Sequence, residues 1–549
     1  AWAGALHQQV GTSLSDQVGA WSGRRRIRQW LVVLAVLALV LLLADWFDTN
    51  EADKLPLALQ RLRSGWLPGD WYLNQPQPHQ WLFLELAGRL INQLGLVSGA
   101  LLIRLAGYGF WGWGVLAVAA ELGLGLPWLL AAVVLWLPRQ GMVAGEWMLG
   151  SAEPKTFAYG LLLLAFVSWR RSRSGWAGLQ AGLACSAHVL VGGYGALTLA
   201  ALAWSRSAQR RCRGWLALTA ALVGAFALYK PVLGRVAELA TPASALPQGL
   251  SPAWLYVVFR HPHHLVPSSW GKGWLVLLVV LAGWSVLGAW LARGAARHLP
   301  NNDAQACRDL WLWSALALVP FGVGLLASLV DPAGVLQQLY PFRLADSLVP
   351  LTLVLVGARA LQALVGSRAI SSRAWWGCCI VGLPALVLVS AGLTSRGAVL
   401  RPWRAFALPT EKADLYRALM AATPPGGRVL TPPGGFSDLA LRTSRAQVVQ
   451  FRQVPGSLRL LGEWSRRLAD LAGSERLLRE GPGGAAAERR LIAAYGRRNP
   501  AALAALAQRY GVVAVVTQAG QQGPAGWHRA WAGSPWWLWL PGAPPGALQ

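Results

Sequence analysis

The sequence predicts an α-helical membrane protein that crosses the bilayer many times and ends in a small α/β domain. The chain has 549 residues, of which 55% are hydrophobic and only 13% are charged. Soluble globular proteins average about 25% charged residues. Apolar runs of about 15–22 residues recur along the chain and are long enough to span a bilayer. Beyond residue 395 these runs stop, and the composition becomes polar and rich in Pro and Gly.

Residues 1–29 form the predicted cytoplasmic N-terminal segment. The basic stretch "GRRRIRQW" precedes the first apolar run, Leu31 to Phe47. Because Lys and Arg concentrate on the cytoplasmic side of membranes, this run is expected to lead outward. It lacks a small-residue cleavage site, so we expect a retained anchor and not a cleavable signal peptide.

Residues 30–395 form the predicted transmembrane domain, with about eleven spans. Trp81 to Leu96 mixes Glu, Arg and Asn with large apolar residues and is typical of an interfacial helix. Arg clusters fall in the loops assigned to the inside, and most carboxylates and His fall in those assigned to the outside. The boundary near Glu121 is weakly marked. The spans expected after the first are 97–120, 122–137, 157–169, 176–190, 191–204, 215–229, 274–292, 310–330, 348–361 and 375–393.

The net charge of +26 comes mostly from Arg. A soluble protein with this charge would suggest nucleic-acid binding. Here much of the Arg lies between apolar runs, where it orients helices, so nucleic acid is not an expected partner. Membrane lipids, including phosphate-bearing lipids, are the expected partners. The five Cys have no zinc-site spacing and are expected to be free thiols.

Residues 396–549 form the predicted C-terminal domain. Helical patterns such as "EKADLYRALMAA" and "PAALAALAQRYG" alternate with the strand patterns "GRVLTPP", "AQVVQF" and "VVAVVT". This alternation predicts a small α/β domain. The odd number of spans places it outside the cell.

The first outside loop, residues 45–81, carries five carboxylates. Asp48 and Glu51 are candidate catalytic bases, although they could equally be solvated loop charges. Asp45 and Asp53 are better explained as structural. Asp70, in "LPGDW", is a candidate substrate-binding residue whose simpler explanation is a turn or a helix cap.

Further polar residues are expected on the same face of the membrane. A carboxylate can take a proton from an acceptor hydroxyl, and Lys or Arg can neutralise a departing phosphate, so this set favours sugar transfer from a lipid phosphate. The additional candidate substrate-binding residues are Glu146, Glu153, Lys155, His188, Arg260, His263, His264 and Arg343.

Each of these candidates also has a structural explanation. Glu153 can start a helix, with Pro following it. His188 could be a buried core histidine, and Arg343 could be a membrane-interface anchor. The "HPHH" stretch suggests a metal site, but three His within four residues rarely all reach one ion, so the metal site stays unknown. A divalent cation, Mg²⁺ or Mn²⁺, is the one candidate cofactor. The sequence contains no phosphate loop, nucleophile elbow, kinase motif set or dinucleotide fingerprint.

The chain resembles in plan the GT-C superfamily of polytopic glycosyltransferases. That group includes oligosaccharyltransferase catalytic subunits, protein mannosyltransferases and aminoarabinose transferases. The resemblance rests on an acidic first outside loop, "DWFDTNEADKLP", a second acidic loop, "GEWMLGSAEPK", and "LYRALMAATPPGGRVLTPP" at the start of the C-terminal domain. The oligosaccharyltransferase "WWDYG"-type motif and a clean Asp-x-Asp are absent. The elements "PGDWYLN", "AEPKTFAYG" and "PHH" also resemble uncharacterised bacterial membrane proteins, which implies no reaction.

The GT-C resemblance implies inverting transfer of a sugar from a polyprenyl-phosphate donor at the outer face of a bacterial plasma membrane. Glu51 or Asp48 would act as the base, and Glu146 or Glu153 would orient the acceptor or a metal. Lys155, Arg260 and Arg343 would hold the lipid phosphate. The alternatives are a lipid or polysaccharide transporter and a non-catalytic envelope-assembly protein. A transporter would show an internal repeat and charges at mid-membrane, neither of which the sequence shows.

Overall fold

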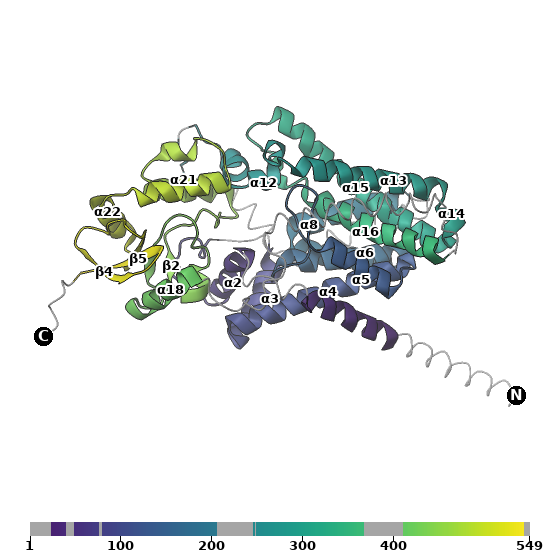
Figure 1. Ribbon diagram of the computed structural model, residues 1–549, viewed down its shortest axis with the longest axis horizontal. Coiled ribbons are helices and arrows are strands. Elements are labelled where there is room, and N and C mark those ends of the chain that lie inside the picture. Colours follow the sequence, from purple (N-terminus) through teal and green to yellow (C-terminus); the bar gives the residue numbers. More distant parts are fainter. Residues whose placement is uncertain are drawn as a thin grey trace.

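The computed structural model describes residues 24–39, 49–75, 80–205, 245–247, 249–366 and 410–542. These residues form a helical bundle and a C-terminal α/β domain at one end of it (Figure 1). Asp48, the end of the first expected span and the spans expected over 215–229 and 375–393 lie outside the described residues.

The bundle contains the helices expected from the apolar runs. Four described helices are long and apolar enough to cross a membrane: α4 (Leu96–Leu122), α13 (Gly273–Arg293), α15 (Asn301–Val330) and α16 (Arg343–Gly366). A multi-pass membrane protein is therefore confirmed, although the described helices leave the count of eleven a prediction. The other bundle helices are residues 24–39, α5 (Leu126–Trp136), α6 (Pro154–Arg170), α7 (Ser174–Ala187), α8 (Val189–Trp204) and the short α14 (Ala295–His298).

Small residues allow the bundle helices to approach closely. A Cβ atom added to Gly160 in α6 would lie 2.8 Å from Phe110 in α4. A Cβ atom on Gly192 in α8 would overlap the backbone of Cys185 in α7. Lipid tails are as apolar as the helices themselves, so helices in a membrane associate mainly through such close packing.

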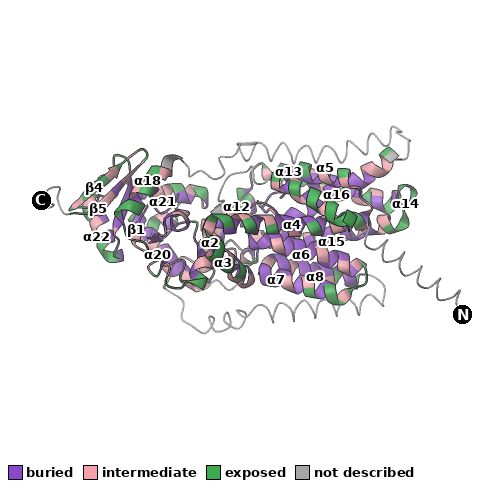
Figure 2. Ribbon diagram, turned by 90° about the horizontal axis from the view of Figure 1, so that it is seen from below, coloured by how far each residue is buried: buried purple, intermediate pink, exposed green. Residues whose placement is uncertain are grey.

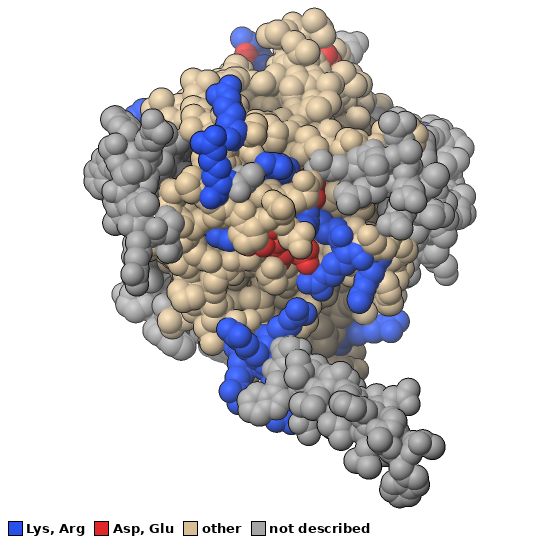
Figure 3. Space-filling view, turned by 90° about the vertical axis from the view of Figure 1, so that its right-hand side faces the viewer, with Lys and Arg blue, Asp and Glu red and all other residues tan. Residues whose placement is uncertain are grey.

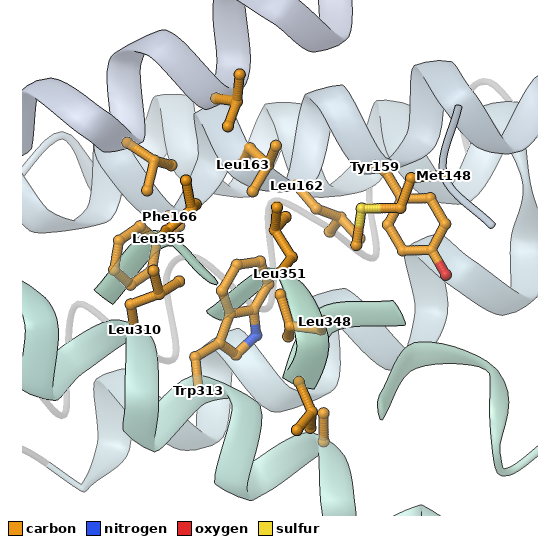
Figure 4. Packing of buried hydrophobic residues seen from close by; sticks show 14 of the residues in the cluster. Met148, Tyr159, Leu162, Leu163, Phe166, Leu310, Trp313, Leu348, Leu351 and Leu355 are labelled. Carbon is orange, nitrogen blue, oxygen red and sulfur yellow. The ribbon is translucent and has the colours of Figure 1, made fainter. Parts of the chain in front are cut away.

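Aromatic rings fill the centre of the bundle. Phe166 and Trp313 stack with their centroids 5.4 Å apart, and Trp313 Nε1 donates a hydrogen bond to Thr198 Oγ1 at 2.9 Å. Figure 4 shows Phe166 and Trp313 among leucines of neighbouring helices, and buried residues line the inside of the bundle in Figure 2. Trp111 and Trp136 stack in the same way, also 5.4 Å apart.

Three of the described loops between the spans contain helices of their own. The first outside loop was expected to be a polar loop, but it folds into α2 (Thr49–Leu62), which packs on α3 (Trp81–Leu94). The helix expected over Trp81 to Leu96 is present as α3, and its position at the membrane interface stays a prediction. The loop before α13 contains α11 (Pro252–Trp254), the π-helical η2 (Leu255–Arg260), α12 (Pro262–Leu265) and η3 (Pro267–Ser269), and η4 (Gln337–Leu339) precedes α16.

The C-terminal domain is built on a five-stranded mixed sheet of order β2-β1-β3-β5-β4. Strands β2, β1 and β3 are parallel, and β5 and β4 add antiparallel. The expected α/β fold is confirmed, but the β4–β5 hairpin and α21 were not predicted from the sequence. The elements are α18 (Thr410–Ala422), β1 (Arg428–Leu430), α19 (Leu439–Thr443), β2 (Ala446–Gln447), η6 (Leu458–Leu460), α20 (Leu461–Ala472), η7 (Glu475–Leu478), α21 (Ala485–Gly496), α22 (Pro500–Tyr510), β3 (Ala514–Gln518), β4 (Trp527–Ala532) and β5 (Trp536–Pro541).

The loops at one end of the bundle hold the C-terminal domain in place. The carboxylate of Asp70 accepts the backbone N–H of Gln447 in β2 at 2.9 Å. The N–H of Gly484 donates to the carbonyl of Phe259 in η2 at 2.7 Å, and the Phe259 ring packs against Trp464. The domain therefore covers the end of the bundle at which the candidate residues gather.

Candidate functional site

A buried lysine lies between two carboxylates at the start of α6. Pro154 opens this helix and places Lys155 in its first turn. The Nζ atom of Lys155 lies 3.4 Å from Glu146 Oε1 and 3.3 Å from Glu153 Oε2. It also lies 3.8 Å from the centre of the Trp147 ring, a cation–π contact. Three of the residues predicted from the sequence therefore meet here.

Arg343 contacts Glu146 from the other side. Its Nε lies 3.0 Å from Glu146 Oε2, and its guanidinium lies 4.0 Å from the centre of the Tyr340 ring. Its Nη1 lies 3.3 Å from His188 Nε2. His188 stands at the break between α7 and α8, where it caps α8 by accepting the N–H of Val191. Glu146 is thus flanked by two cations that come from different membrane helices.

Glu153 is held by three side-chain donors in addition to Lys155. It accepts hydrogen bonds from Asn50 at 3.0 Å, Trp147 Nε1 at 3.1 Å and Ser151 Oγ at 2.5 Å. Burial alone would raise the pKa of Glu153, but the ammonium of Lys155 and these three donors hold the pKa below its usual value. Glu153 is therefore ionised at neutral pH and poorly suited to take up a proton.

Glu51, a predicted catalytic base, lies in a buried ion pair next to this network. Arg104 Nε donates to Glu51 Oε1 at 2.6 Å, and Arg104 Nη2 donates to Glu51 Oε2. The backbone N–H of Ala152 also donates to Oε1, at 2.6 Å. The Glu51 side chain is 0% exposed. In this arrangement Glu51 joins α2, α4 and the second outside loop, and both of its oxygens are bound.

Asp346 shapes the loop that carries Glu146. It accepts three backbone N–H groups, from Val143 at 2.7 Å, Ala144 at 3.0 Å and Glu146 at 3.0 Å. Asp346 stands one helical turn after Arg343, so α16 both positions the loop and supplies a cation to the carboxylate on it.

His264, in α12, contacts the same loop. Its Nδ1 lies 2.5 Å from the carbonyl oxygen of Ala144. Burial and nearby cations lower the pKa values of His261 and His264 well below the usual 6.5, and lower that of His263 to about 4. All three imidazoles are therefore neutral at pH 7.

Two other predicted residues contact the C-terminal domain instead. Arg260 Nη2 donates to the carbonyl of Arg452 at 2.9 Å, and its guanidinium lies 5.3 Å from the Phe451 ring centre. Burial lowers the pKa of Arg260. Asp70 also accepts the N–H of Leu73 at 3.0 Å, and burial raises its pKa to about 6. Both residues connect the loops to the domain.

Glu146 Oε1 and Arg343 Nε are both buried and make no hydrogen bond with the described residues. The nearest cation to Glu146 Oε1 is Lys155 Nζ at 3.4 Å, and Arg343 Nε lies 3.0 Å from Glu146 Oε2. Buried carboxylate oxygens are normally hydrogen-bonded, so Glu146 Oε1 is available to a hydrogen-bond donor from a bound ligand.

The described residues do not fit a divalent cation at this position. The space between Glu146 and Glu153 holds the ammonium of Lys155, which already neutralises both. No group of three His, Cys, Asp or Glu able to hold a metal occurs among residues that the structure describes. A cofactor such as Mg²⁺ or Mn²⁺ remains an untested prediction.

Arg104, Asp346, Trp147 and Asn50 belong to the network but were not among the candidates chosen from the sequence. Arg104 lies in the middle of an apolar run, where a charged residue signals a buried partner, so the sequence did contain a signal for it. Asp346, three positions past the "YPFR" stretch, had a weaker sequence signal. Asn50 and Trp147 resemble ordinary loop residues, and nothing in the sequence indicated that they belong to the network.

Comparisons with known proteins give a structural similarity but no sequence match. No protein-family model matches the sequence, and no curated protein is significantly similar to it. The structure is similar to the crystal structure of ArnT from Cupriavidus metallidurans in the apo state. The alignment covers 95% of this chain and 99% of that chain, with a TM-score of 0.44 and 13% sequence identity.

Proposed function

We propose that this protein is an integral-membrane glycosyltransferase that moves a sugar from a polyprenyl-phosphate donor to an acceptor at the outer face of a bacterial plasma membrane. One observation carries the proposal. Glu146, a buried carboxylate whose Oε1 accepts no hydrogen bond from the described residues, lies between Arg343 and Lys155 at the end of the bundle under the C-terminal domain. A carboxylate beside two cations combines a base with a phosphate-binding site.

The two cations would bind the donor phosphate. Arg343 matches the geometry of phosphate oxygens and can donate two parallel hydrogen bonds. Lys155 adds a compact charge that Trp147 holds in place. In the absence of donor, Glu146 and Glu153 neutralise both cations, so the buried network carries no uncompensated positive charge. Donor binding would transfer Arg343 and Lys155 from Glu146 to the phosphate.

Glu146 would then act as the general base. As the acceptor oxygen forms its bond to C1 of the sugar, the bond between C1 and the phosphate oxygen breaks. The electron pair leaves with the polyprenyl phosphate, and the acceptor proton goes to Glu146 Oε1. Attack from the face opposite the phosphate inverts the anomeric carbon. The cations stabilise the charge that develops on the leaving group.

Glu51 would be a positioning residue, because both of its oxygens are held by Arg104 and the Ala152 N–H. The pair fixes the second outside loop on α4. Asp48, the other base predicted from the sequence, lies outside the described residues and is the competing candidate for the proton acceptor.

The test is a transfer assay on the purified full-length protein. Wild type, Glu146→Gln and Asp48→Asn would be given a panel of polyprenyl-phosphate sugars, with a total membrane extract as the acceptor source. Positioned general bases contribute about 10²–10⁴-fold to rate, so we expect a loss of that size for Glu146→Gln. The polyprenyl phosphate released and the sugar transferred should be equal in amount.

A matched control is Glu121→Gln. Glu121 also pairs with two arginines, Arg170 at 3.2 Å and Arg171 at 2.7 Å, at the other end of the same helices. It should keep wild-type transfer. If Asp48→Asn loses transfer and Glu146→Gln keeps it, the base is in the first loop. If folded wild type transfers no sugar from any donor, the proposed activity is wrong and a transport or scaffold role takes its place.

A further inference from the structure

A cavity of about 740 Å³ opens at the end of the bundle opposite the candidate site. Lys155 stands in the first turn of α6, whereas the cavity is lined by the last turns of that helix, at Leu164, Val167 and Ser168. Twelve residues of helix, from 155 to 167, correspond to about 18 Å. The cavity is therefore separate from the network around Glu146, and its volume lies within the ~300–1,000 Å³ of small-molecule sites.

The mouth of the cavity is basic. Arg25, Arg26, Arg171 and Arg173 line it, and no Asp or Glu does. Arg171 pairs with Glu121, but Arg25, Arg26 and Arg173 have no carboxylate partner among the described residues. Figure 3 shows this end of the molecule, where Lys and Arg side chains surround a smaller acidic group. The mouth is thus suited to an anion.

The wall of the cavity is apolar. Trp113, Leu116 and Ala117 come from α4, Leu124 and Leu126 from the turn into α5, and Leu164 and Val167 from α6. The Trp113 side chain is 40% exposed. A free phosphate ion would use the arginines but leave this wall in contact with water, whereas a lipid would cover both.

We propose that this cavity binds an anionic glycerophospholipid, with its phosphate at Arg25 and Arg26 and the first part of an acyl chain against Trp113 and Leu164. The bundle end that carries the dense Arg is the one that faces the cytoplasm under the positive-inside rule. The cytoplasmic leaflet is where anionic lipids supply a negative surface. The site does not depend on the proposed transfer reaction at the opposite face.

The test uses the full-length protein in a neutral detergent. Native mass spectrometry would measure retention of added dioleoyl phosphatidylglycerol and dioleoyl phosphatidylcholine by wild type and by R25Q/R26Q. The matched control is R24Q/R28Q, which removes two arginines from the same exposed helical turns but from positions that do not line the cavity. A third variant, Ala117→Trp, fills the apolar part and leaves the charges in place.

We expect one retained phosphatidylglycerol per chain, in preference to phosphatidylcholine. R25Q/R26Q should weaken its binding on the order of tenfold or more, since each basic residue near an anionic lipid contributes about fivefold. R24Q/R28Q should bind as wild type, and Ala117→Trp should bind more weakly.

Three results would overturn the proposal. Equal retention of the two lipids would mean that the phosphate site does not select an anion. Equal losses of phosphatidylglycerol binding in R25Q/R26Q and R24Q/R28Q would show that the lipid is attracted only by the overall positive charge of this end of the bundle. Full competition by soluble glycerol phosphate at the concentration of the lipid would identify a free phosphate and not a lipid as the ligand.

Discussion

Arg104 and Glu51 form a buried ion pair in which Arg104 Nε lies 2.6 Å from Glu51 Oε1 and the two side chains are 4% and 0% exposed. The pair joins α4, a membrane helix, to α2, the helix of the first outside loop. Glu51, predicted from the sequence as a catalytic base, thus has both carboxylate oxygens bound in the structure, and its catalytic role stays a prediction.

Replacing one member of this pair should be strongly destabilising. Glu51→Ala or Arg104→Ala leaves an uncompensated buried charge, a change that costs about 3–5 kcal/mol. Thermal unfolding of the detergent-solubilised protein would measure it. The exposed pair of Arg89 and Glu85 serves as the control, because Arg89→Ala should change stability by about 1 kcal/mol or less. If Glu51→Ala unfolds like wild type but transfers no sugar, Glu51 is catalytic and not structural.

Asp346→Ala should loosen the loop that carries Glu146. It removes one acceptor from three backbone N–H groups, and hydrogen bonds to charged groups contribute about 1.5–3 kcal/mol each. We expect faster hydrogen exchange over residues 143–146, and a lower transfer rate together with a higher KM for the donor. Asp331→Ala is the control, because Asp331 also accepts two backbone N–H groups but holds a different loop. Unchanged exchange at 143–146 would rule out this role.

The buried histidines should make the folded protein less stable as the pH falls below 6.5. The pKa values of His261 and His264 are lowered in the folded protein, chiefly by burial, so the unfolded chain binds more protons in that range. The contribution of each neutral histidine to the free energy of unfolding is therefore fully present above pH 6.5. It is lost on acidification, by at most about 2 kcal/mol per histidine between pH 6.5 and 5. His264→Gln should reduce the pH dependence of the unfolding temperature. His528→Gln, at an exposed position on β4, should not; equal slopes for the two variants would contradict the assignment.

Asp70→Ala should weaken the attachment of the C-terminal domain to the first outside loop. The substitution leaves the N–H groups of Gln447 and Leu73 without their acceptor. We expect faster amide exchange at both residues, while the α21 amides stay protected. Asp414→Ala, which removes an exposed carboxylate in the same domain, should leave the Gln447 amide unchanged. If the Gln447 amide stays protected from exchange in Asp70→Ala, the sheet and not Asp70 is the cause of its protection.

Local patterns in the sequence were sufficient to predict the elements of the bundle. Apolar runs of span length predicted α4, α13, α15 and α16, because the hydrophobic thickness of a bilayer sets the length of a spanning helix. The alternation of short helical and strand patterns predicted the C-terminal sheet. Helix α2 was not predicted, because its sequence is polar and contains Pro56, and its apolar face is stabilised by tertiary packing against α3 and α19.

The sequence by itself determined that carboxylates, cations and histidines would gather at one end of a membrane bundle. Loop positions and the charge bias between the two sides are enough for that conclusion, and Glu146, Glu153, Lys155, His188 and Arg343 do lie together. Only the tertiary structure decided which charge pairs with which. Glu51 meets Arg104 from 53 positions further along the chain, and Asp346 reaches the N–H of Val143 across 203 positions. Such pairings depend on how helices approach one another through small residues, and periodicity within a single helix contains no information about its neighbours.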